Sequence, residues 1–226
     1  MNLDREAALK MPHLGGLSLR VRQRFLQEGS AAPNLHHPHI VQVHQSGVHR
    51  GICYLVSEYC PGRTLRRFLN EVHKIGSARE AVRIVLPLAE AVAHAHQNGI
   101  VHRDIKPANV ILDARGTSDG LPYCPKLTDF GTAKFIGAEH TLTAGDMLIG
   151  TLPYMSPEQV SGDAEIGPAC DIYALGVLLY ETMAGEFPIR GDTNADTIHK
   201  IVHSDPPPLH RKLPGIPRDL SAICGR

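Results

Sequence analysis

Hydrophobic and polar positions near the start of the chain predict a small unit of strands and one helix. Residues 6–10 have the composition of the end of a strand. Residues 40–43 and 52–56 are strand-like runs joined by a glycine-bounded turn at residues 47–51. Residues 20–35 carry apolar side chains at helical spacing. We therefore expect a small sheet with one helix on its side.

The pattern becomes helical after residues 59–62, where a Pro-Gly pair predicts a hinge. Helices are predicted over residues 64–72, 77–97, 170–184 and 193–202, and short strands over residues 110–112 and 126–128. Ser77 is a candidate N-cap of the long helix, Gly99 is a stop signal, and Pro87 is expected to kink it. The rest of the chain therefore predicts a larger, mostly helical unit.

Composition narrows the possible partners and compartment. Of the 226 residues, 42% are hydrophobic and 20% are charged, as in an ordinary soluble globular protein. The 23 basic residues balance the 23 acidic ones, so neither nucleic acid nor an acidic membrane is an expected partner. We find no bilayer-length apolar run and no signal-peptide pattern. Five widely spaced cysteines fit a reducing cytosol, so a cytoplasmic location is predicted.

Two motifs that each contain an aspartate carry the candidate chemistry. Residues 102–109 contain Asp104, Lys106 and Asn109, and Asp129 follows in an Asp-Phe-Gly sequence. Asp104 can accept a hydrogen bond from a substrate hydroxyl, and Lys106 can hold charge on a transferring phosphate. Asn109 and Asp129 supply hard oxygen ligands that suit Mg²⁺. An ordinary polar loop is the alternative, but two motifs in this order make it a poor explanation.

These segments resemble the catalytic loop and the metal-binding loop of protein kinases, and nearly the whole chain resembles a bacterial serine/threonine protein kinase. The resemblance implies an α+β, bilobal fold with a partial, sheet-plus-helix N-terminal lobe at residues 1–60. A larger, mostly helical C-terminal lobe would occupy residues 61–226. The implied activity is transfer of the γ-phosphoryl group of ATP, with Mg²⁺, to serine or threonine hydroxyls of a protein substrate. Asp104, Lys106 and Asn109 would be catalytic, and Asn109 and Asp129 would hold the metal.

The resemblance also implies a nucleotide site. Lys10 matches the strand lysine that grips the α- and β-phosphates, and Glu28 matches the helix glutamate that holds this lysine. Residues 55–60 match the strand and hinge that bind the adenine edge through backbone groups, which makes Glu58 and Cys60 candidates. Asp129 completes the ATP-binding set.

Three further matches concern substrate and control. Residues 150–158 resemble the platform that receives the substrate, and Thr151 would bond near Asp104 and favour an aliphatic hydroxyl over tyrosine. Arg103 precedes the catalytic aspartate, as in kinases whose activation loop is phosphorylated, and the candidate acceptors are Thr141 and Thr143. Asp171 resembles the helix aspartate that anchors the catalytic-loop backbone.

The sequence also departs from the family pattern. Only nine residues precede Lys10, which leaves no room for the usual glycine-rich loop, so the chain resembles a kinase core cut at both ends. A catalytically weak pseudokinase scaffold, or a kinase fragment, is therefore an alternative. A small-molecule phosphotransferase of the aminoglycoside-kinase type is another, against which Lys106 and residues 150–158 argue. The histidine-rich residues 35–40 suggest a metal site, but Pro38 favours a loop.

Overall fold

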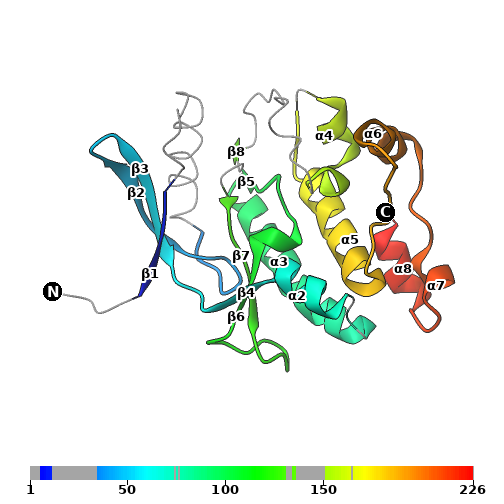
Figure 1. Ribbon diagram of the computed structural model, residues 1–226, viewed down its shortest axis with the longest axis horizontal. Coiled ribbons are helices and arrows are strands. Elements are labelled where there is room, and N and C mark those ends of the chain that lie inside the picture. Colours follow the sequence, from blue (N-terminus) through cyan, green and yellow to red (C-terminus); the bar gives the residue numbers. More distant parts are fainter. Residues whose placement is uncertain are drawn as a thin grey trace.

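A computed structural model describes most of the chain as a small sheet beside a larger, mostly helical part (Figure 1). The residues that it describes are 6–11, 35–73, 75, 77–130, 134–135, 151–163 and 165–225. This arrangement confirms the predicted α+β class. The predicted helix at residues 20–35 lies outside the described residues, except for Leu35. The predicted division of the chain after residue 60 stays a prediction.

The small sheet has the strand order β1-β3-β2, with both pairs antiparallel. Its strands are β1 (Ala7–Lys10), β2 (Val43–His49) and β3 (Ile52–Glu58). The β2–β3 hairpin closes through Arg50 and Gly51, which both have positive φ angles of 49° and 80°. Such a two-residue turn matches the right-handed twist of its strands. The sheet places Lys10 at the end of β1, opposite Leu55 of β3.

The predicted bounds of the first strand of this hairpin were wrong. Ile40 forms only an isolated bridge with Leu127, and the strand begins at Val43. Gly47, predicted to open the turn, lies inside β2. Ile40 and Val41 are apolar because they are buried, at 2% and 6% exposure, and Ile40 belongs to the core of the larger part. Burial by another unit, rather than strand pairing, explains the apolar run.

The larger part combines a second sheet with helices. Strands β4 (Gly62–Thr64), β6 (Val110–Asp113) and β7 (Cys124–Leu127) pair in the order β4-β6-β7, and β5 (Ile100–Val101) pairs with β8 (Lys134–Phe135). The helices are α2 (Leu65–Val72), α3 (Ala78–Gln97), α4 (Pro157–Ser161), α5 (Ala169–Ala184), α6 (Asn194–His203), α7 (Leu209–Lys212) and α8 (Arg218–Cys224). Two single 3₁₀ turns, η2 (Pro107–Asn109) and η4 (Leu152–Tyr154), lie near the candidate site.

Helices α3 and α5 form the centre of the larger core. Ile84 and Leu88 of α3 and Leu178 of α5 have no exposed surface. The side chain of Ser77 accepts a hydrogen bond from the amide of Glu80 at 3.2 Å, which confirms the predicted cap of α3. The helix continues through Pro87. These two helices support the loop between β5 and β6, because Asp171 of α5 binds the loop backbone and His96 of α3 contacts Asp171.

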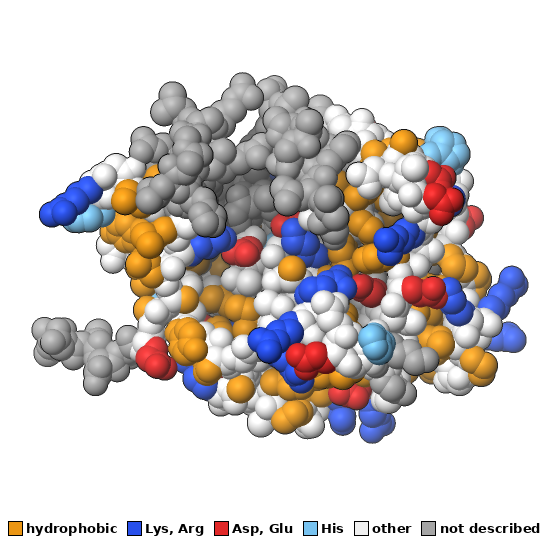
Figure 2. Space-filling model, in the orientation of Figure 1, with side chains coloured by type: hydrophobic (Ala, Val, Ile, Leu, Met, Phe, Trp, Pro, Cys, Tyr) orange, Lys and Arg blue, Asp and Glu red, His pale blue; other side chains and the backbone are white. Residues whose placement is uncertain are grey.

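The visible surface mixes charges of both signs. In Figure 2, Lys and Arg side chains alternate with Asp and Glu across the described part of this face, in keeping with a net charge of zero. None of the helices in the described ranges is long and apolar enough to span a bilayer.

Candidate active site

The predicted catalytic loop is anchored to α5 by one buried carboxylate. Asp171, which is 1% exposed, accepts backbone hydrogen bonds from His102 at 2.8 Å and from Arg103 at 2.7 Å. His96 Nε2 of α3 lies 2.8 Å from the same carboxylate. Burial raises the pKa of Asp171, but the bond to His96, the charge of His102 and the two amides outweigh it, and its pKa is lowered. The loop therefore sits on an ionised aspartate.

His96 was not identified from the sequence. It occupies the last turn of α3, six positions before His102, and nothing in the apolar pattern of the helix distinguishes it. Its contact with Asp171 spans 75 residues of chain. Only the fold shows that α3 contributes to the support of the loop.

The carboxylate of Asp104 is held on both oxygens. Lys106 Nζ lies 2.8 Å from Asp104 Oδ1 and 3.0 Å from Thr151 Oγ1. Asn109 Nδ2 donates to Asp104 Oδ2 at 3.0 Å and to the Asp104 backbone oxygen at 2.8 Å. The side chains of Asp104 and Lys106 keep 19% and 21% exposure. The pair is thus oriented by neighbours and still accessible to a substrate.

Strand pairing brings Asp129 to this loop. Val110 of β6 pairs with Leu127 of β7, so the residue before β6 lies beside the residues after β7. The backbone amide of Thr128 donates to the backbone oxygen of Asn109 at 2.9 Å, and His102 Nε2 lies 3.0 Å from the backbone oxygen of Thr128. Two motifs that are far apart in the sequence therefore meet at one edge of the β4-β6-β7 sheet.

Two residues at this edge have left-handed backbone. Arg103 has φ 67° and Asp129 has φ 64°. For non-glycine residues this conformation costs about 1–3 kcal/mol each, and it persists where the surroundings enforce it. Such positions cluster at functional sites, which supports the assignment of both segments.

The residues here fit a magnesium ion. Asn109 uses its amide nitrogen on Asp104, which leaves the amide oxygen available to a cation. Asp129 offers a carboxylate that is 39% exposed, and hard oxygen ligands of this kind are what Mg²⁺ takes in phosphate-binding sites. The donor set therefore has the chemistry that the predicted metal needs.

Lys10 reaches the same aspartate from the small sheet. Its Nζ lies 2.5 Å from Asp129 Oδ1, across 119 residues of chain. The predicted partner, Glu28, lies outside the described residues. The contact places the predicted phosphate-binding lysine at the predicted metal ligand, although the role of Lys10 stays a prediction.

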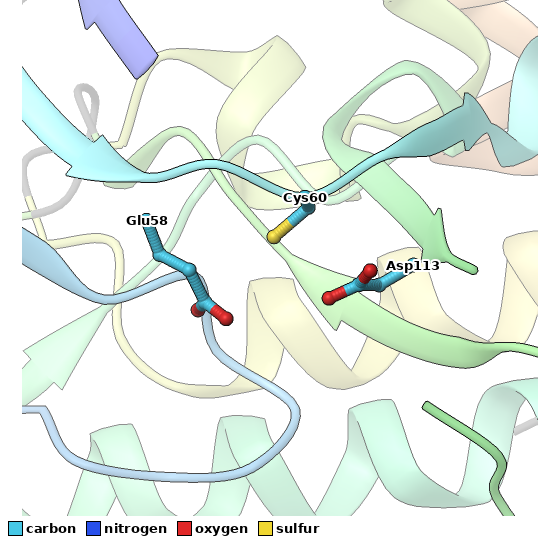
Figure 3. A group of neighbouring side chains, drawn as sticks. All are labelled: Glu58, Cys60 and Asp113. Atoms are coloured by element: carbon cyan, nitrogen blue, oxygen red, sulfur yellow. The ribbon is translucent and has the colours of Figure 1, made fainter. Parts of the chain in front are cut away.

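Glu58 is the last residue of β3, and Cys60 lies in the predicted hinge between β3 and β4. Their side chains point to the same side, toward Asp113 at the end of β6 (Figure 3). Glu58 contacts Lys126 at 2.6 Å and Arg115 at 3.0 Å. Because their side chains are engaged there, their backbone groups are the candidates for contact with a nucleotide, and this role stays a prediction.

The predicted substrate platform is fixed to the catalytic loop. Ser156 and Gln159 form a capping box at the start of α4, and Gln159 Nε2 donates to the Arg103 oxygen at 2.9 Å. Behind them, Tyr154 donates to Glu181 at 2.5 Å. Burial, followed by the charge of Glu181, strongly raises the pKa of Tyr154, so this hydroxyl remains a donor.

Arg103 uses only part of its guanidinium in hydrogen bonds to the described residues. Its Nη2 donates to the Ile166 oxygen at 2.7 Å, while Nε and Nη1 are buried and have no hydrogen-bond partner among the described residues. Burial lowers the pKa of Arg103, and the nearby carboxylate of Asp171 opposes this effect. A buried guanidinium with free donors is suited to an anion. Thr141 and Thr143, the predicted phosphate acceptors, lie outside the described residues.

Fold and site together define a protein kinase domain, and comparison with known proteins agrees. The chain belongs to the protein kinase domain family, whose sequence profile matches residues 3–214.

Two of the similar proteins come from bacteria. The chain is 35% identical over 222 residues to the serine/threonine-protein kinase PrkC of Bacillus subtilis, covering 98% of this chain and 33% of PrkC. It is 36% identical over 207 residues to the serine/threonine-protein kinase PknB of Mycobacterium tuberculosis, covering 88% of this chain and 31% of PknB. The chain thus spans about one third of the length of these relatives.

Proposed function

We propose that this chain is a serine/threonine protein kinase unit, which transfers the γ-phosphoryl group of ATP to Ser or Thr hydroxyls of a protein substrate. One observation carries the proposal. The Asp104 carboxylate is held by Lys106 and Asn109, and the pairing of β6 with β7 brings Asp129 beside this loop. The names of the similar proteins support the same activity.

Each residue of the site has a defined task in this reaction. Asp104 accepts the hydrogen of the substrate hydroxyl and directs its oxygen at the phosphorus. Lys106 holds negative charge on the transferring phosphate. Lys10 binds the phosphates of ATP, and Asn109 and Asp129 would hold Mg²⁺, which would supply positive charge beside the phosphate oxygens.

The preference for serine and threonine follows from the platform. Lys106 bridges Asp104 and Thr151, with contacts of 2.8 and 3.0 Å. The proposed platform therefore starts one side chain away from the proposed base. A short aliphatic hydroxyl fits such a close approach better than a tyrosine ring, which would hold its oxygen farther from the backbone.

The free state of the cysteines in the described residues supports a cytoplasmic setting for this unit.

Product analysis tests both activity and preference. The protein is incubated with Mg²⁺, γ-labelled ATP and an unfolded protein that contains Ser, Thr and Tyr, and the labelled amino acids are identified. We expect label on Ser and Thr. Asp129→Asn should lose transfer at least about tenfold because a charged metal ligand is removed. Asp205→Asn, which changes an exposed aspartate after α6, should leave transfer unchanged.

Other outcomes identify the alternatives. Stabilisation by Mg-ATP with no label on any protein would favour the pseudokinase scaffold. Label on an aminoglycoside but not on protein would favour the small-molecule phosphotransferase. Label mainly on tyrosine would contradict the role given to Thr151.

A further inference from the structure

Behind the hinge, charged side chains from three segments form one network. Arg115 donates from Nε to Asp113 Oδ1 at 3.2 Å and from Nη2 to Asp113 Oδ2 at 3.0 Å. The same Nη2 lies 3.0 Å from Glu58 Oε1. Lys126 of β7 lies 2.6 Å from the same Glu58 oxygen. Arg115 therefore links the last residue of β3 to the last residue of β6.

This group could be mistaken for a metal site. One ligand atom each of Glu58, Cys60 and Asp113 lies within 4.8 Å of the others (Figure 3). However, Arg115 and Lys126 already balance the two carboxylates charge for charge. Burial, followed by the charge of Glu58, raises the pKa of Cys60 to about 12, so the thiol keeps its proton. The network is better explained as a closed set of ion pairs.

Arg115 is the central residue of this network because it is the main partner of the buried Asp113. The Asp113 side chain is 4% exposed, and its pKa is lowered because the hydrogen bonds from Arg115 outweigh the effect of burial. A buried carboxylate requires such a partner. Glu58 is more exposed, at 24%, and is bound by both cations. Loss of Arg115 would thus leave Asp113 with only its longer contact to Lys126, at 4.0 Å, and would remove one of two cations from Glu58.

The backbone of the hinge is held at the same place. The amide of Ala114, next to Arg115, donates to the Pro61 oxygen at 2.7 Å. At the other end, the amide of Glu58 donates to the Gln42 oxygen at 2.8 Å. The backbone of residues 58–61 is therefore held at both ends by hydrogen bonds to neighbouring segments.

We propose that Arg115 is a positioning residue for nucleotide binding. Its guanidinium ties Glu58 of the hinge to Asp113 of the larger lobe and so holds the backbone groups of residues 58–60 where they meet the base of the nucleotide. This inference rests on the proposed function. It predicts an effect on nucleotide affinity that is separate from catalysis, because Asp104 and Lys106 are held by other contacts.

The test separates affinity from turnover. Arg115→Met keeps the length of the side chain and removes both ion pairs. We expect it to raise the KM for ATP and the Kd for Mg-ADP about fivefold to tenfold while kcat stays within about twofold. Arg115→Lys keeps the charge but cannot form the bidentate contact with Asp113. Its affinity for Mg-ADP should therefore lie between those of Arg115→Met and the wild type.

Arg83→Met is the matched control. Arg83 of α3 pairs with Asp119 at 3.2 Å, in the same β6–β7 connection, and this pair does not include a hinge residue. It should leave the KM for ATP unchanged. An unchanged KM in Arg115→Met, or an equal rise in Arg83→Met, overturns the inference while the proposed function stands. A wild-type protein that neither binds Mg-ADP nor transfers phosphate overturns the proposed function, and the inference with it.

Discussion

At the scale of single residues, the site depends on two carboxylates that several neighbouring groups hold. Asp171 receives two amides and one histidine, and Asp104 receives a lysine and an amide. Such networks stabilise a conformation when every member is satisfied, and they become costly when one member is lost.

Asp171→Ala should destabilise the protein by about 3–5 kcal/mol, because it leaves two buried amides and His96 without their acceptor. Urea unfolding at pH 7 measures this change. Asp205→Ala, at an exposed position, should stay within about 0.5 kcal/mol of the wild type. Equal stability of the two variants would contradict the anchoring role of Asp171.

His37 predicts a dependence on pH. Its Nδ1 accepts a hydrogen bond from the backbone amide of His39 at 3.2 Å. Its ring stacks on the ring of His94, with 5.4 Å between the ring centroids. Burial lowers the pKa of His37 from 6.5, and the charges of His39 and His94 lower it further, against an opposing effect of Glu90. Because the folded state binds protons less well, the stability contributed by neutral His37 is complete above pH 6.5 and is lost as the pH falls below it.

The stability difference between wild type and His37→Asn should therefore shrink between pH 7.5 and 5.5 in urea unfolding. His44→Asn, at an exposed position in β2, should show no such change. A difference that is constant or grows toward pH 5.5 would contradict the account of His37.

At the scale of elements, the sequence was sufficient where structure is local. The cap at Ser77, the apolar length of α3 and the helices at α2, α5 and α6 were predicted because each depends on neighbours within a few positions. The start of β2 was mispredicted because Ile40 is apolar for a tertiary reason. Contacts such as Lys10–Asp129 and His96–Asp171 join distant segments, and no local pattern specifies them.

Gly62 tests the contact between the hinge and β6. A Cβ atom added here would lie 2.0 Å from the Leu112 backbone oxygen, so β4 and β6 could not keep their present distance. We expect Gly62→Ala to lower the free energy of unfolding by about 1–3 kcal/mol. Gly167→Ala is the control, because nothing lies within 4 Å of the added atom. Equal unfolding midpoints for the two variants in urea would contradict this close approach.

At the scale of the whole molecule, the two parts meet at the proposed nucleotide site. Lys10 reaches it from the β1-β3-β2 sheet, Asp129 reaches it from β7, and Arg115 secures the hinge between them. The family was recognisable from the sequence because its motifs are short and local. Their convergence needed the fold, since it arises from the antiparallel pairing of β6 with β7.

The most direct measurement is phosphoryl transfer by Asp104→Asn at saturating Mg-ATP, with nucleotide binding measured on the same sample. A base that acts only on the hydroxyl contributes about 10²–10⁴-fold to the rate, so transfer should fall at least about 100-fold. Binding of Mg-ATP should stay within about twofold, because Lys10, Asn109 and Asp129 are intact. Transfer at the wild-type rate would contradict the assignment of Asp104 as the base.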